Sequence, residues 1–548
     1  MNLILAPNLV SKLDWTMFAV LAVVSSVMMI FVGYKLLQML QLSGYKLNGF
    51  FKWFKETKCS YLSRLFMLSF LSLAAMLITN VLLADFFVEK VLSYASVLFY
   101  ILFSSLFITN LFTAKQKTPL KYTKRMTRLV IVFFLLAGGF TWAMQYVGYR
   151  FVPYLRFGLI GITPVVLPLF VLLAYFITWP IEKLIASRYI KKAKSKLKAQ
   201  KDLVVVGITG SYGKTTVKNI LETILSEKFK VCASPSSYNT PLGLAKTILS
   251  NLDEKDEVFI AEMGAKQMLD IKELCDMVEP KIGVLTGVGN QHLLTFGSLE
   301  NIVKTKSELA EYITETKGEL FVNVDSALSK EIAKHYSNAK TVSIESASGE
   351  IYADNIKSTK DGIVFDLVFA GEKVKCKTIL LGKHNISNIL LASRVALAMG
   401  LTLKQIASGI EKLRTVPHRL EIVKSSSTYT IIDDAYNSSV EGSKASLEVL
   451  STFAGKKFVI TPGLVELGAE QFNSNFEFGK DMAAVCDYVI IDSAINAEAI
   501  KAGLVFAGFD ENKIIQVATL SQAVEALNKY ADFESVVLFE NDLPDNYS

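Results

Sequence analysis

A glycine-rich turn between an apolar run and a helical pattern constrains this chain more than any other feature. The β-branched run 204–208 leads into Thr209-Gly210-Ser211-Tyr212-Gly213-Lys214-Thr215-Thr216, and a helix is expected over 217–229. A strand, a glycine loop and a helix N-terminus in this order surround an anion with backbone N–H groups and positive partial charge, which is typical of phosphate binding. Lys214 can reach the outer phosphates, and the Thr215 hydroxyl suits a Mg²⁺ ligand. The sequence therefore predicts a nucleotide site that uses Gly210, Ser211, Tyr212, Gly213, Lys214, Thr215 and Thr216.

The apolar residues concentrate in the first 180 positions, and the remainder has the composition of a soluble enzyme. A helix needs about 20 apolar residues to cross a hydrocarbon layer of about 30 Å. Five runs meet this length: 15–37, 61–86, 91–112, 129–147 and 157–179. We therefore expect a membrane domain over residues 1–200, with about five transmembrane helices and a basic linker at its end.

Basic residues are abundant in every second loop of this region. They are abundant after the first run, after the third run and after the fifth run, and sparse in the other two loops. Cytoplasmic loops carry such an excess, so we expect a multi-pass protein of the cell membrane with its N-terminus outside and its catalytic domains in the cytoplasm. For the linker 183–201, a solvated helix face that sets topology and an amphipathic segment on anionic lipid both remain open. The expected spans lack the buried charges of an ion pathway, which favours anchoring over transport.

The net charge and the cysteines argue against a nucleic-acid-binding protein and against a disulfide-linked or zinc-binding fold. The net charge of +7 concentrates near the apolar region and gives no indication of a nucleic-acid partner. The five cysteines have no paired spacing, so neither a disulfide framework nor a zinc site is expected, in keeping with a reducing compartment.

Two polar residues follow buried strands further along the chain. Glu262 ends the run 257–261, and His292 follows the run 282–288. In a doubly wound sheet, ligands bind at the carboxyl ends of the strands. Together with Thr215, these side chains would form a mixed nitrogen and oxygen site for a divalent cation.

The motifs continue in a fixed order over roughly residues 203–470. They are 209–216, Asn239-Thr240-Pro241, Glu262-Met263-Gly264, 292–308, 382–388, 416–421 and 433–437. This series resembles the Mur ligase family, ATP-dependent amide ligases of cell-wall precursor synthesis, and within it the MurF type, which adds D-alanyl-D-alanine. The resemblance implies a P-loop α/β central domain over 201–415 and a Rossmann-like α/β domain over 416–548, both following the helical membrane region. Residues 317–377 are expected to form a β-rich insertion.

The resemblance also implies a reaction. ATP phosphorylates a substrate carboxylate, an amine attacks the acyl phosphate, and phosphate leaves as the amide forms. Lys214 and Mg²⁺ would neutralise the two anions that must approach each other. In related ligases a lysine after the histidine motif is carbamylated and binds metal; by position this is Lys306. We thus expect Lys214, Lys306 and His292 to be catalytic, and Thr215, Glu262, His292 and Lys306 to bind metal.

The remaining roles are carried over from the same motifs. His384, Asn385 and Asn388 are expected on the adenine side, Arg419 at the γ-phosphate and Asp434 at the ribose. The loop Thr461-Pro462-Gly463-Leu464 lies where relatives bind the incoming amine, and differs from the Gly-Asp-Met of soluble MurF.

The substrate is the point at which the chain departs from the family. Mur ligases begin with a soluble domain that holds a UDP-linked precursor, and the apolar region occupies its place. The acceptor is expected to be a UDP- or lipid-linked muropeptide, and the amine an amino acid or dipeptide, with membrane lipids and other cell-wall enzymes as further partners. Two alternatives remain: a membrane-bound ligase of another polymer, similar to poly-glutamate synthases, and an ATPase-coupled transporter.

Overall fold

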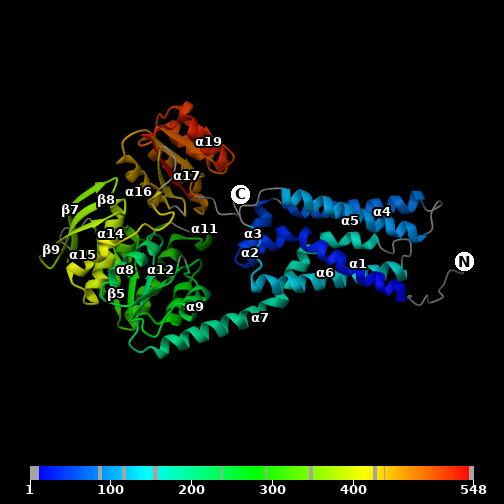
Figure 1. The fold of residues 1–548 in the computed structure, drawn as a ribbon, viewed down its shortest axis with the longest axis horizontal. Helices are drawn as coiled ribbons and strands as arrows, with labels where there is room; N and C mark the ends of the chain where they lie inside the picture. The colour runs from blue at the N-terminus through cyan, green and yellow to red at the C-terminus, as the bar shows by residue number, and fades with distance from the viewer. Residues whose placement is uncertain are drawn as a thin grey trace. The chain divides into compact units, whose positions relative to one another are not determined.

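The computed structural model describes residues 12–57, 59–83, 89–113, 119–151, 158–235, 238–289, 293–344, 350–423, 429–436 and 439–541 (Figure 1). The chain divides into two compact units. Residues 1–186 form a helical unit, and residues 187–543 form an α/β unit. Each unit is described by itself below.

The helical unit consists of helices joined by short connections. They are α1 (Lys12–Val32), α2 (Tyr34–Leu42), α3 (Leu47–Glu56), α4 (Ser60–Leu83), α5 (Glu89–Thr113), α6 (Lys124–Phe151), the 3-10 turn η2 (Gly158–Ile162) and α7 (Thr163–Ala199). Helices α1 and α6 pack closely at Gly138. A Cβ on this residue would lie only 2.7 Å from the Ser26 hydroxyl, so no larger side chain fits there. Small residues permit this approach between apolar helices. Ser25 also connects α1 to its neighbours, since its hydroxyl lies 2.7 Å from that of Tyr100 and 3.2 Å from that of Thr141.

Among the described residues, three helical stretches are long and apolar enough to cross a membrane. They are Ser60–Ile78, Lys124–Phe151 and Leu159–Ala199. A fourth is obtained if Phe18–Val32 and Tyr34–Leu42, which meet at a 49° bend, act as one span. The bend interrupts the expected run 15–37 at Gly33, where a Cβ would lie 3.1 Å from the Phe133 ring. The apolar helix Val97–Leu111 is shorter, so a fifth span stays a prediction.

The end of α7, which carries the basic linker, belongs to the α/β unit and packs against it. Ala193 and Leu197 are buried in that unit's core. Lys196 donates from Nζ to the carbonyl oxygens of Ile248 at 2.9 Å and Leu252 at 2.6 Å. Lys194 also contacts the protein, through the carbonyl oxygen of residue 276. These two lysines bind protein carbonyls. For the linker as a whole, both alternatives stay predictions.

The phosphate loop lies at the centre of a six-stranded parallel sheet. The order is β2-β3-β1-β4-β5-β6, with β1 (Val204–Thr209), β2 (Val231–Ala233), β3 (Val258–Glu262), β4 (Ile282–Leu285), β5 (Glu319–Asn323) and β6 (Ala339–Val342). The strands are nearly continuous apolar runs, as parallel strands covered on both faces require. Ile208 pairs with Glu262 in the β1–β3 register, so the two strands end side by side.

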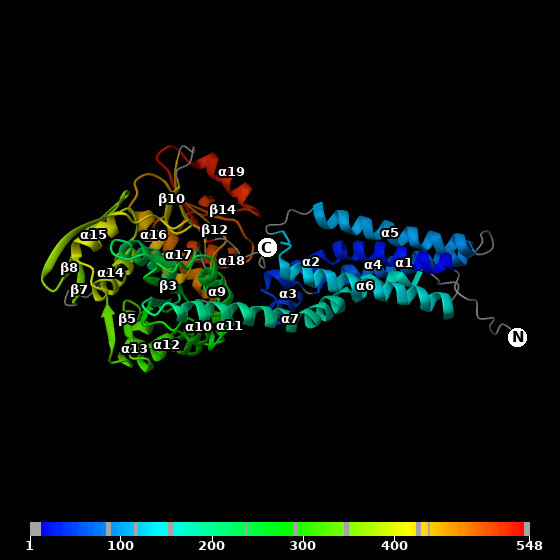
Figure 2. The ribbon, with the colours of Figure 1, turned by 60° about the horizontal axis from the view of Figure 1, so that its bottom comes forward.

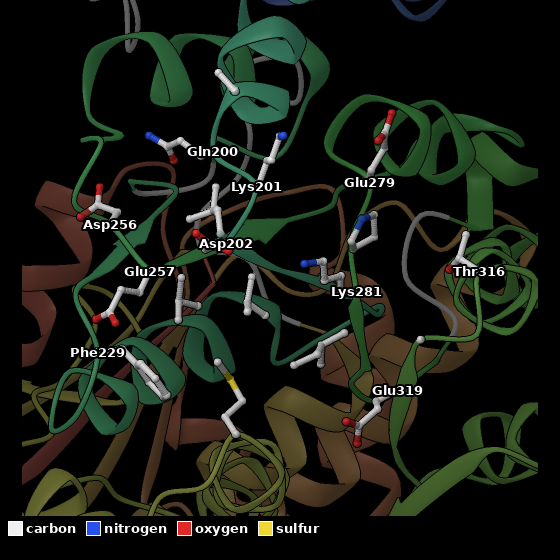
Figure 3. A pocket seen from close by; sticks show the side chains of 18 of the residues that line it. Gln200, Lys201, Asp202, Phe229, Asp256, Glu257, Glu279, Lys281, Thr316 and Glu319 are labelled. Atoms are coloured by element: carbon white, nitrogen blue, oxygen red, sulfur yellow. The ribbon is translucent and has the colours of Figure 1, made fainter.

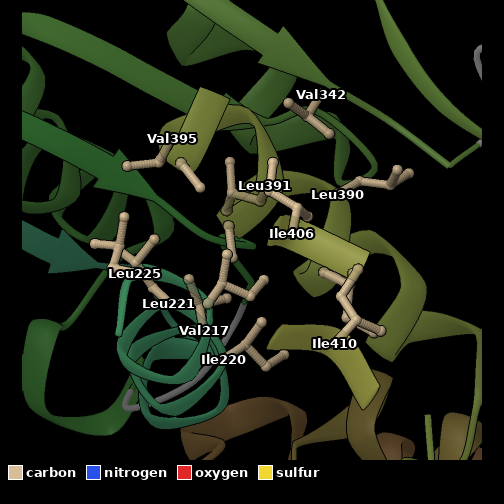
Figure 4. Packing of buried hydrophobic residues seen from close by; sticks show 14 of the residues in the cluster. Val217, Ile220, Leu221, Leu225, Val342, Leu390, Leu391, Val395, Ile406 and Ile410 are labelled. Carbon is tan, nitrogen blue, oxygen red and sulfur yellow. The ribbon is translucent and has the colours of Figure 1, made fainter. Parts of the chain in front are cut away.

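Helices cover both faces of this sheet. They are α8 (Lys214–Leu225), α9 (Pro241–Ser250), α10 (Asp270–Val278), α11 (Leu293–Phe296), α12 (Leu299–Glu315), α13 (Ala327–Lys334), α14 (Lys383–Ala398) and α15 (Leu403–Glu411). Figure 4 shows how Val217 and Leu221 of α8 meet Leu391 of α14 and Ile406 of α15 in one apolar cluster. This packing fixes α8, and hence the loop before it, against the first turn of α14.

The β-rich insertion is smaller than expected. It is a three-stranded antiparallel sheet of β7 (Ile351–Thr359), β8 (Gly362–Phe369) and β9 (Glu372–Thr378). The expected range 317–377 also included β5, α13 and β6, which belong to the main sheet because β5 pairs with β4.

The C-terminal part has its own six-stranded sheet, ordered β10-β11-β15-β12-β13-β14 (Figure 2, orange to red). Its strands are β10 (Glu421–Val423), β11 (Thr430–Asp434), β12 (Lys457–Thr461), β13 (Tyr488–Ile491), β14 (Ile514–Gln516) and β15 (Val536–Glu540). Its helices are α16 (Val440–Ser451), η3 (Gly468–Glu470), α17 (Gln471–Ala483), α18 (Ala497–Phe506), η4 (Glu511–Lys513) and α19 (Leu520–Tyr530). All strand pairs are parallel except the edge pair β10–β11, which agrees with the expected Rossmann-like arrangement. The expected domain limits at residues 200 and 415 stay predictions.

Candidate functional site

The phosphate loop is fixed by residues beneath it. Gly210 has φ +153°, and a Cβ there would lie 1.9 Å from the Thr286 hydroxyl. That hydroxyl donates to the Tyr212 carbonyl oxygen at 2.5 Å, and Ser211 N–H donates to the Gly287 carbonyl at 2.8 Å. Gly213, at φ +80°, then precedes the first residue of α8. The end of β4 therefore shapes the loop, a role for Thr286 that the loop motif alone does not reveal.

Lys214 folds back over its own loop. Its Nζ donates to the carbonyl oxygens of Gly210 at 2.9 Å and Ser211 at 3.0 Å. Desolvation lowers the pKa of Lys214 to about 8, opposed by the charge of Glu262 and reinforced by that of Arg419. The β3 carboxylate and the arginine of the C-terminal part thus both act electrostatically on the loop lysine.

Glu262 is buried at the end of β3, where its two oxygens have different surroundings. Oε1 accepts a hydrogen bond from Asn239 Nδ2 at 3.1 Å. Oε2 has no hydrogen-bond partner within the described part of the chain, and Lys218 Nζ lies 3.4 Å from it. Lys218 was not among the predicted site residues. The available signal was its spacing, since Lys218 lies one helical turn after Lys214 on α8.

Lys306 is buried on α12, with 3% of its surface exposed. Burial, together with the charge of Lys214, lowers the pKa of Lys306 to about 7. Lys306 therefore lies within electrostatic reach of Lys214, and a large fraction of its amine is neutral at neutral pH. Its catalytic and metal-binding roles stay predictions.

The expected metal set is described only in part, because His292 lies outside the described residues. Within those residues, no group of three or more His, Cys, Asp or Glu side chains is arranged to hold a metal ion. The buried Glu262 Oε2 nevertheless suits a divalent cation, because it is a carboxylate oxygen to which no described residue donates a hydrogen bond, and because Glu262 lines the same cavity as the phosphate loop.

The first turn of α14 faces the phosphate loop. Asn385 Nδ2 donates to the Leu381 carbonyl at 2.7 Å, and Asn388 Nδ2 donates to Asn385 Oδ1 at 3.2 Å. Asn388 Oδ1 in turn lies 3.1 Å from the position that a Cβ on Gly213 would take. Desolvation lowers the pKa of His384 to about 4, so its ring is neutral at neutral pH, and its buried Nδ1 has no partner among the described residues.

The C-terminal part contributes a second wall. Arg419 Cζ lies over the Tyr436 ring, 4.5 Å from the centroid. Asp434 accepts a hydrogen bond from Leu420 N–H at 3.2 Å, and desolvation raises the pKa of Asp434 to about 6. Beside them, His418 Nδ1 lies 2.7 Å from Asp433 Oδ2.

These residues line one cavity of about 840 Å³. Of the predicted residues, it includes Ser211, Tyr212, Gly213, Lys214, Thr215, Thr216, Glu262, His384, Asn385, Asn388, Arg419 and Asp434. Gly210 and Lys306 lie outside its lining. A larger hollow of about 1380 Å³ lies among the strand starts and the end of α7, where Asp202, Lys281 and Glu319 are seen in Figure 3. It contains none of the predicted residues.

A separate network of amides fixes the loop after β12. Asn475 accepts a hydrogen bond from Leu464 N–H at 2.8 Å and donates to the Leu464 carbonyl at 2.9 Å. Asn496 Nδ2 donates to the Pro462 carbonyl at 3.0 Å, and Asn541 Nδ2 donates to the Gly463 carbonyl at 2.7 Å. Three buried asparagines therefore hold the loop 462–464.

Family models match both parts of the chain that line this cavity. The Mur ligase middle domain matches residues 208–396, and the Mur ligase glutamate ligase domain matches residues 418–540, together more than half of the chain. The chain belongs to the Mur ligase family. Both matches begin after residue 207, so they leave the helical unit of this Mur ligase unassigned.

Several curated relatives are similar to this Mur ligase. The UDP-N-acetylmuramoyl-tripeptide–D-alanyl-D-alanine ligase of Mycobacterium tuberculosis H37Rv is 28% identical over 320 residues, which is 56% of this chain and 62% of that protein. The Escherichia coli K12 ligase of the same name is 30% identical over 278 residues, 50% of this chain and 61% of that protein. The chain thus spans less than two thirds of the length of these relatives.

Solved structures agree on the fold. MurF from Thermotoga maritima in complex with ADP has a TM-score of 0.57 and 28% identity, covering 65% of this chain and 80% of that one. MurF from Acinetobacter baumannii has a TM-score of 0.59 at 23% identity, covering 66% of this chain and 78% of that one. At that lower identity, the likeness shows the fold alone.

Proposed function

We propose that this Mur ligase is an ATP-dependent, ADP-forming amide ligase that activates a carboxylate as an acyl phosphate and transfers it to an amine. MurF-like addition of D-alanyl-D-alanine to a muropeptide is the reaction that its relatives favour. The observation that carries the proposal is the cavity of about 840 Å³, which the phosphate loop, Glu262, the start of α14 and the pair Arg419–Asp434 all line.

The charges around this cavity suit a polyphosphate. Arg419 interacts electrostatically with both Lys214 and Lys218, and Glu262 is the carboxylate whose charge acts on both lysines. Positive groups fixed in place before the reaction stabilise charge that develops on a transferred phosphoryl group, because they need no reorganisation. In our proposal Lys214 exchanges its two loop carbonyls for phosphate oxygens, and Arg419 reaches the γ-phosphate from the C-terminal wall.

Glu262 and Thr215 are the described residues that would hold Mg²⁺, with His292 and Lys306 as the further ligands expected from the sequence. The ion would supply charge neutralisation between the carboxylate substrate and the γ-phosphate. On the base side, Asn385 and Asn388 would contact adenine with a neutral His384, while Asp434 would accept from the ribose hydroxyls.

Lys306 fits the proposed carbamylation. Carbamylation requires a neutral amine, whose nitrogen attacks CO₂ and releases one proton as the carbamate anion forms. A lysine with a pKa of about 7 supplies that amine at neutral pH. The product is an anion within electrostatic reach of Lys214, so it attracts that lysine, whereas a protonated Lys306 would repel it.

The helical unit is proposed to anchor the enzyme in the membrane with the ligase in the cytoplasm. Helix α6 begins with Lys124, Arg125 and Arg128, and it carries Trp142 and Tyr146 near its other end. Trp15 stacks on Trp142 with ring centroids 5.4 Å apart, forming an exposed aromatic cluster. From Arg128 to Tyr146 a helix spans about 27 Å at about 1.5 Å per residue, close to the hydrocarbon thickness of about 30 Å. Basic residues at one end and aromatic residues at the other are typical of membrane helices.

The proposal is tested with purified full-length protein in detergent, ATP, Mg²⁺ and D-alanyl-D-alanine. One arm receives a UDP-linked muramoyl tripeptide, and the other receives the lipid-linked form. Phosphate release and a product heavier by the added dipeptide, seen by mass spectrometry, are expected in at least one arm. Phosphate release with glutamate, but not with D-alanyl-D-alanine, would instead assign the enzyme to another polymer. No turnover in any arm would contradict the ligase assignment.

A further inference from the structure

Lys218 and Glu262 form a charge pair that is removed from solvent. Lys218 lies one turn into α8, and its Nζ is 3.4 Å from Glu262 Oε2. The side chains are 2% and 1% exposed. Buried charges are tolerated only when they are compensated, because desolvation costs several kcal/mol for each ion.

The pair is not built for maximal stability. An ammonium hydrogen-bonded to a carboxylate lies at about 2.7–2.9 Å, whereas this contact is 3.4 Å. Glu262 Oε1 is engaged by Asn239, but Oε2 has no hydrogen bond among the residues that the structure describes. The oxygen nearest Lys218 therefore keeps its capacity for another positive partner.

Lys218 has a second carboxylate within reach. Glu222 follows it by one turn on α8, and the charges of Lys218 and Glu222 influence each other. Residues four apart on a helix are neighbours. If another cation takes Glu262, Glu222 still compensates the charge of Lys218, so the lysine need not leave its buried position unpaired.

We propose that Lys218 is a positioning residue, an internal counter-ion that holds the Glu262 carboxylate at the phosphate loop until Oε2 binds the divalent cation that accompanies the nucleotide. The inference rests on the proposed function. Because Lys218 and the cation compete for Glu262, the lysine sets the affinity of the site for the metal as well as the stability of the metal-free chain.

The test measures Mn²⁺ binding by electron paramagnetic resonance, using the full chain in detergent with ADP. Lys218→Met removes the competing charge but keeps the length of the side chain. We expect Mn²⁺ to bind at least about fivefold more tightly, the lower end of typical coupling between sites. Thermal unfolding without metal should occur at a lower temperature, because Glu262 is then buried without its counter-ion. Lys330→Met, at an exposed lysine of α13, is the matched control and should change neither quantity.

Lys218→Gln keeps a hydrogen-bond donor for Glu262 and carries the test if the methionine variant does not fold. It should likewise bind Mn²⁺ more tightly than the wild type. In Lys218→Met/Glu262→Gln, metal-free stability should recover, since no unpaired charge remains. An unchanged or weaker Mn²⁺ affinity in the single variants would make Lys218 a purely structural partner and overturn the inference. A wild-type chain that binds no Mn²⁺ with ADP would instead overturn the proposed function.

Discussion

Arg419 lies over the ring of Tyr436, with its Cζ 4.5 Å from the ring centroid, and both residues line the same cavity as the phosphate loop. The arginine is thus held by an aromatic face, through a contact that does not itself use a guanidinium hydrogen bond. This contact gives Tyr436 a role that its position in a sequence motif does not reveal.

Replacing Tyr436 should therefore weaken ATP binding through Arg419. A cation–π contact at a half-exposed site contributes about 0.5–1 kcal/mol, or roughly two- to fivefold in affinity. We expect Tyr436→Leu to raise the KM for ATP by that factor in a phosphate-release assay, whereas Tyr436→Phe keeps the ring and should remain near the wild-type value. An equal rise in both variants would point to the hydroxyl group instead.

Lys306 should be essential, and Lys304 should not. Lys306→Ala removes the proposed carbamate and should reduce turnover by about 100-fold or more, as for the loss of a group that stabilises transition-state charge. Short carboxylates should restore part of the activity. Lys304→Ala, at an exposed lysine of the same helix, is the control. Full activity of Lys306→Ala would remove Lys306 from the site.

Carbamylation of Lys306 should depend on pH. Its amine has a pKa of about 7, so the neutral fraction that reacts with CO₂ falls as the pH drops through 7. At constant dissolved CO₂, the ¹³C carbamate signal in nuclear magnetic resonance should be larger at pH 8 than at pH 6. A signal that rises toward acidic pH would contradict the assignment.

Asp434→Asn should raise the stability of the protein and weaken its ATP binding at pH 7.5. Desolvation raises the pKa of Asp434 from 3.8 to about 6, so the folded state binds more protons than the unfolded state between these values. Wild-type stability therefore decreases as the pH rises through this window. At pH 7.5 the asparagine variant, which keeps the acceptor for Leu420 N–H, should be more stable by about 1–2 kcal/mol after allowance for solvent screening. The gain should vanish near pH 3, and ATP affinity should fall at pH 7.5.

Gly210→Ala should damage the phosphate loop, because its new methyl group would overlap the Thr286 hydroxyl at 1.9 Å. Overpacking of this kind typically costs about 1–3 kcal/mol. Thermal unfolding should show the loss, and Gly210→Ala/Thr286→Ala should recover part of it. If the double variant is as unstable as the sum of the two single variants, the overlap is not the cause.

Sequence reasoning located the residues whose role depends on local pattern. The phosphate loop and Glu262 follow apolar runs, so their places at the ends of parallel strands could be inferred from order alone, whereas the start of α14 was expected at the site only through the family resemblance. Lys218 was missed because it resembles any helix lysine until β3 is known to place Glu262 under α8. Thr286 was missed for a related reason, since it acts through a neighbouring strand.

In the helical unit, too, contacts between elements that are distant in sequence could not be predicted. Hydropathy predicted apolar helices, and three of the described stretches have the length to cross a membrane. At the bend, a Cβ on Gly33 would lie 3.1 Å from the Phe133 ring of α6, a contact that no local pattern encodes. Likewise, the lysines at the end of α7 look like a solvated basic tail in sequence, but Lys196 binds helix-end carbonyls of the α/β unit.

The loop 462–464 is held by the amides of Asn475, Asn496 and Asn541, which carry no net charge. Dissolved ions screen interactions between charges over about 10 Å at 0.1 M, but they leave such neutral, buried bonds nearly unchanged. The wall on the proposed amine side therefore keeps its shape as ionic strength varies. Sensitivity to salt is then expected from the cavity of the proposed nucleotide site, which the charged groups of Lys214, Arg419 and Glu262 line.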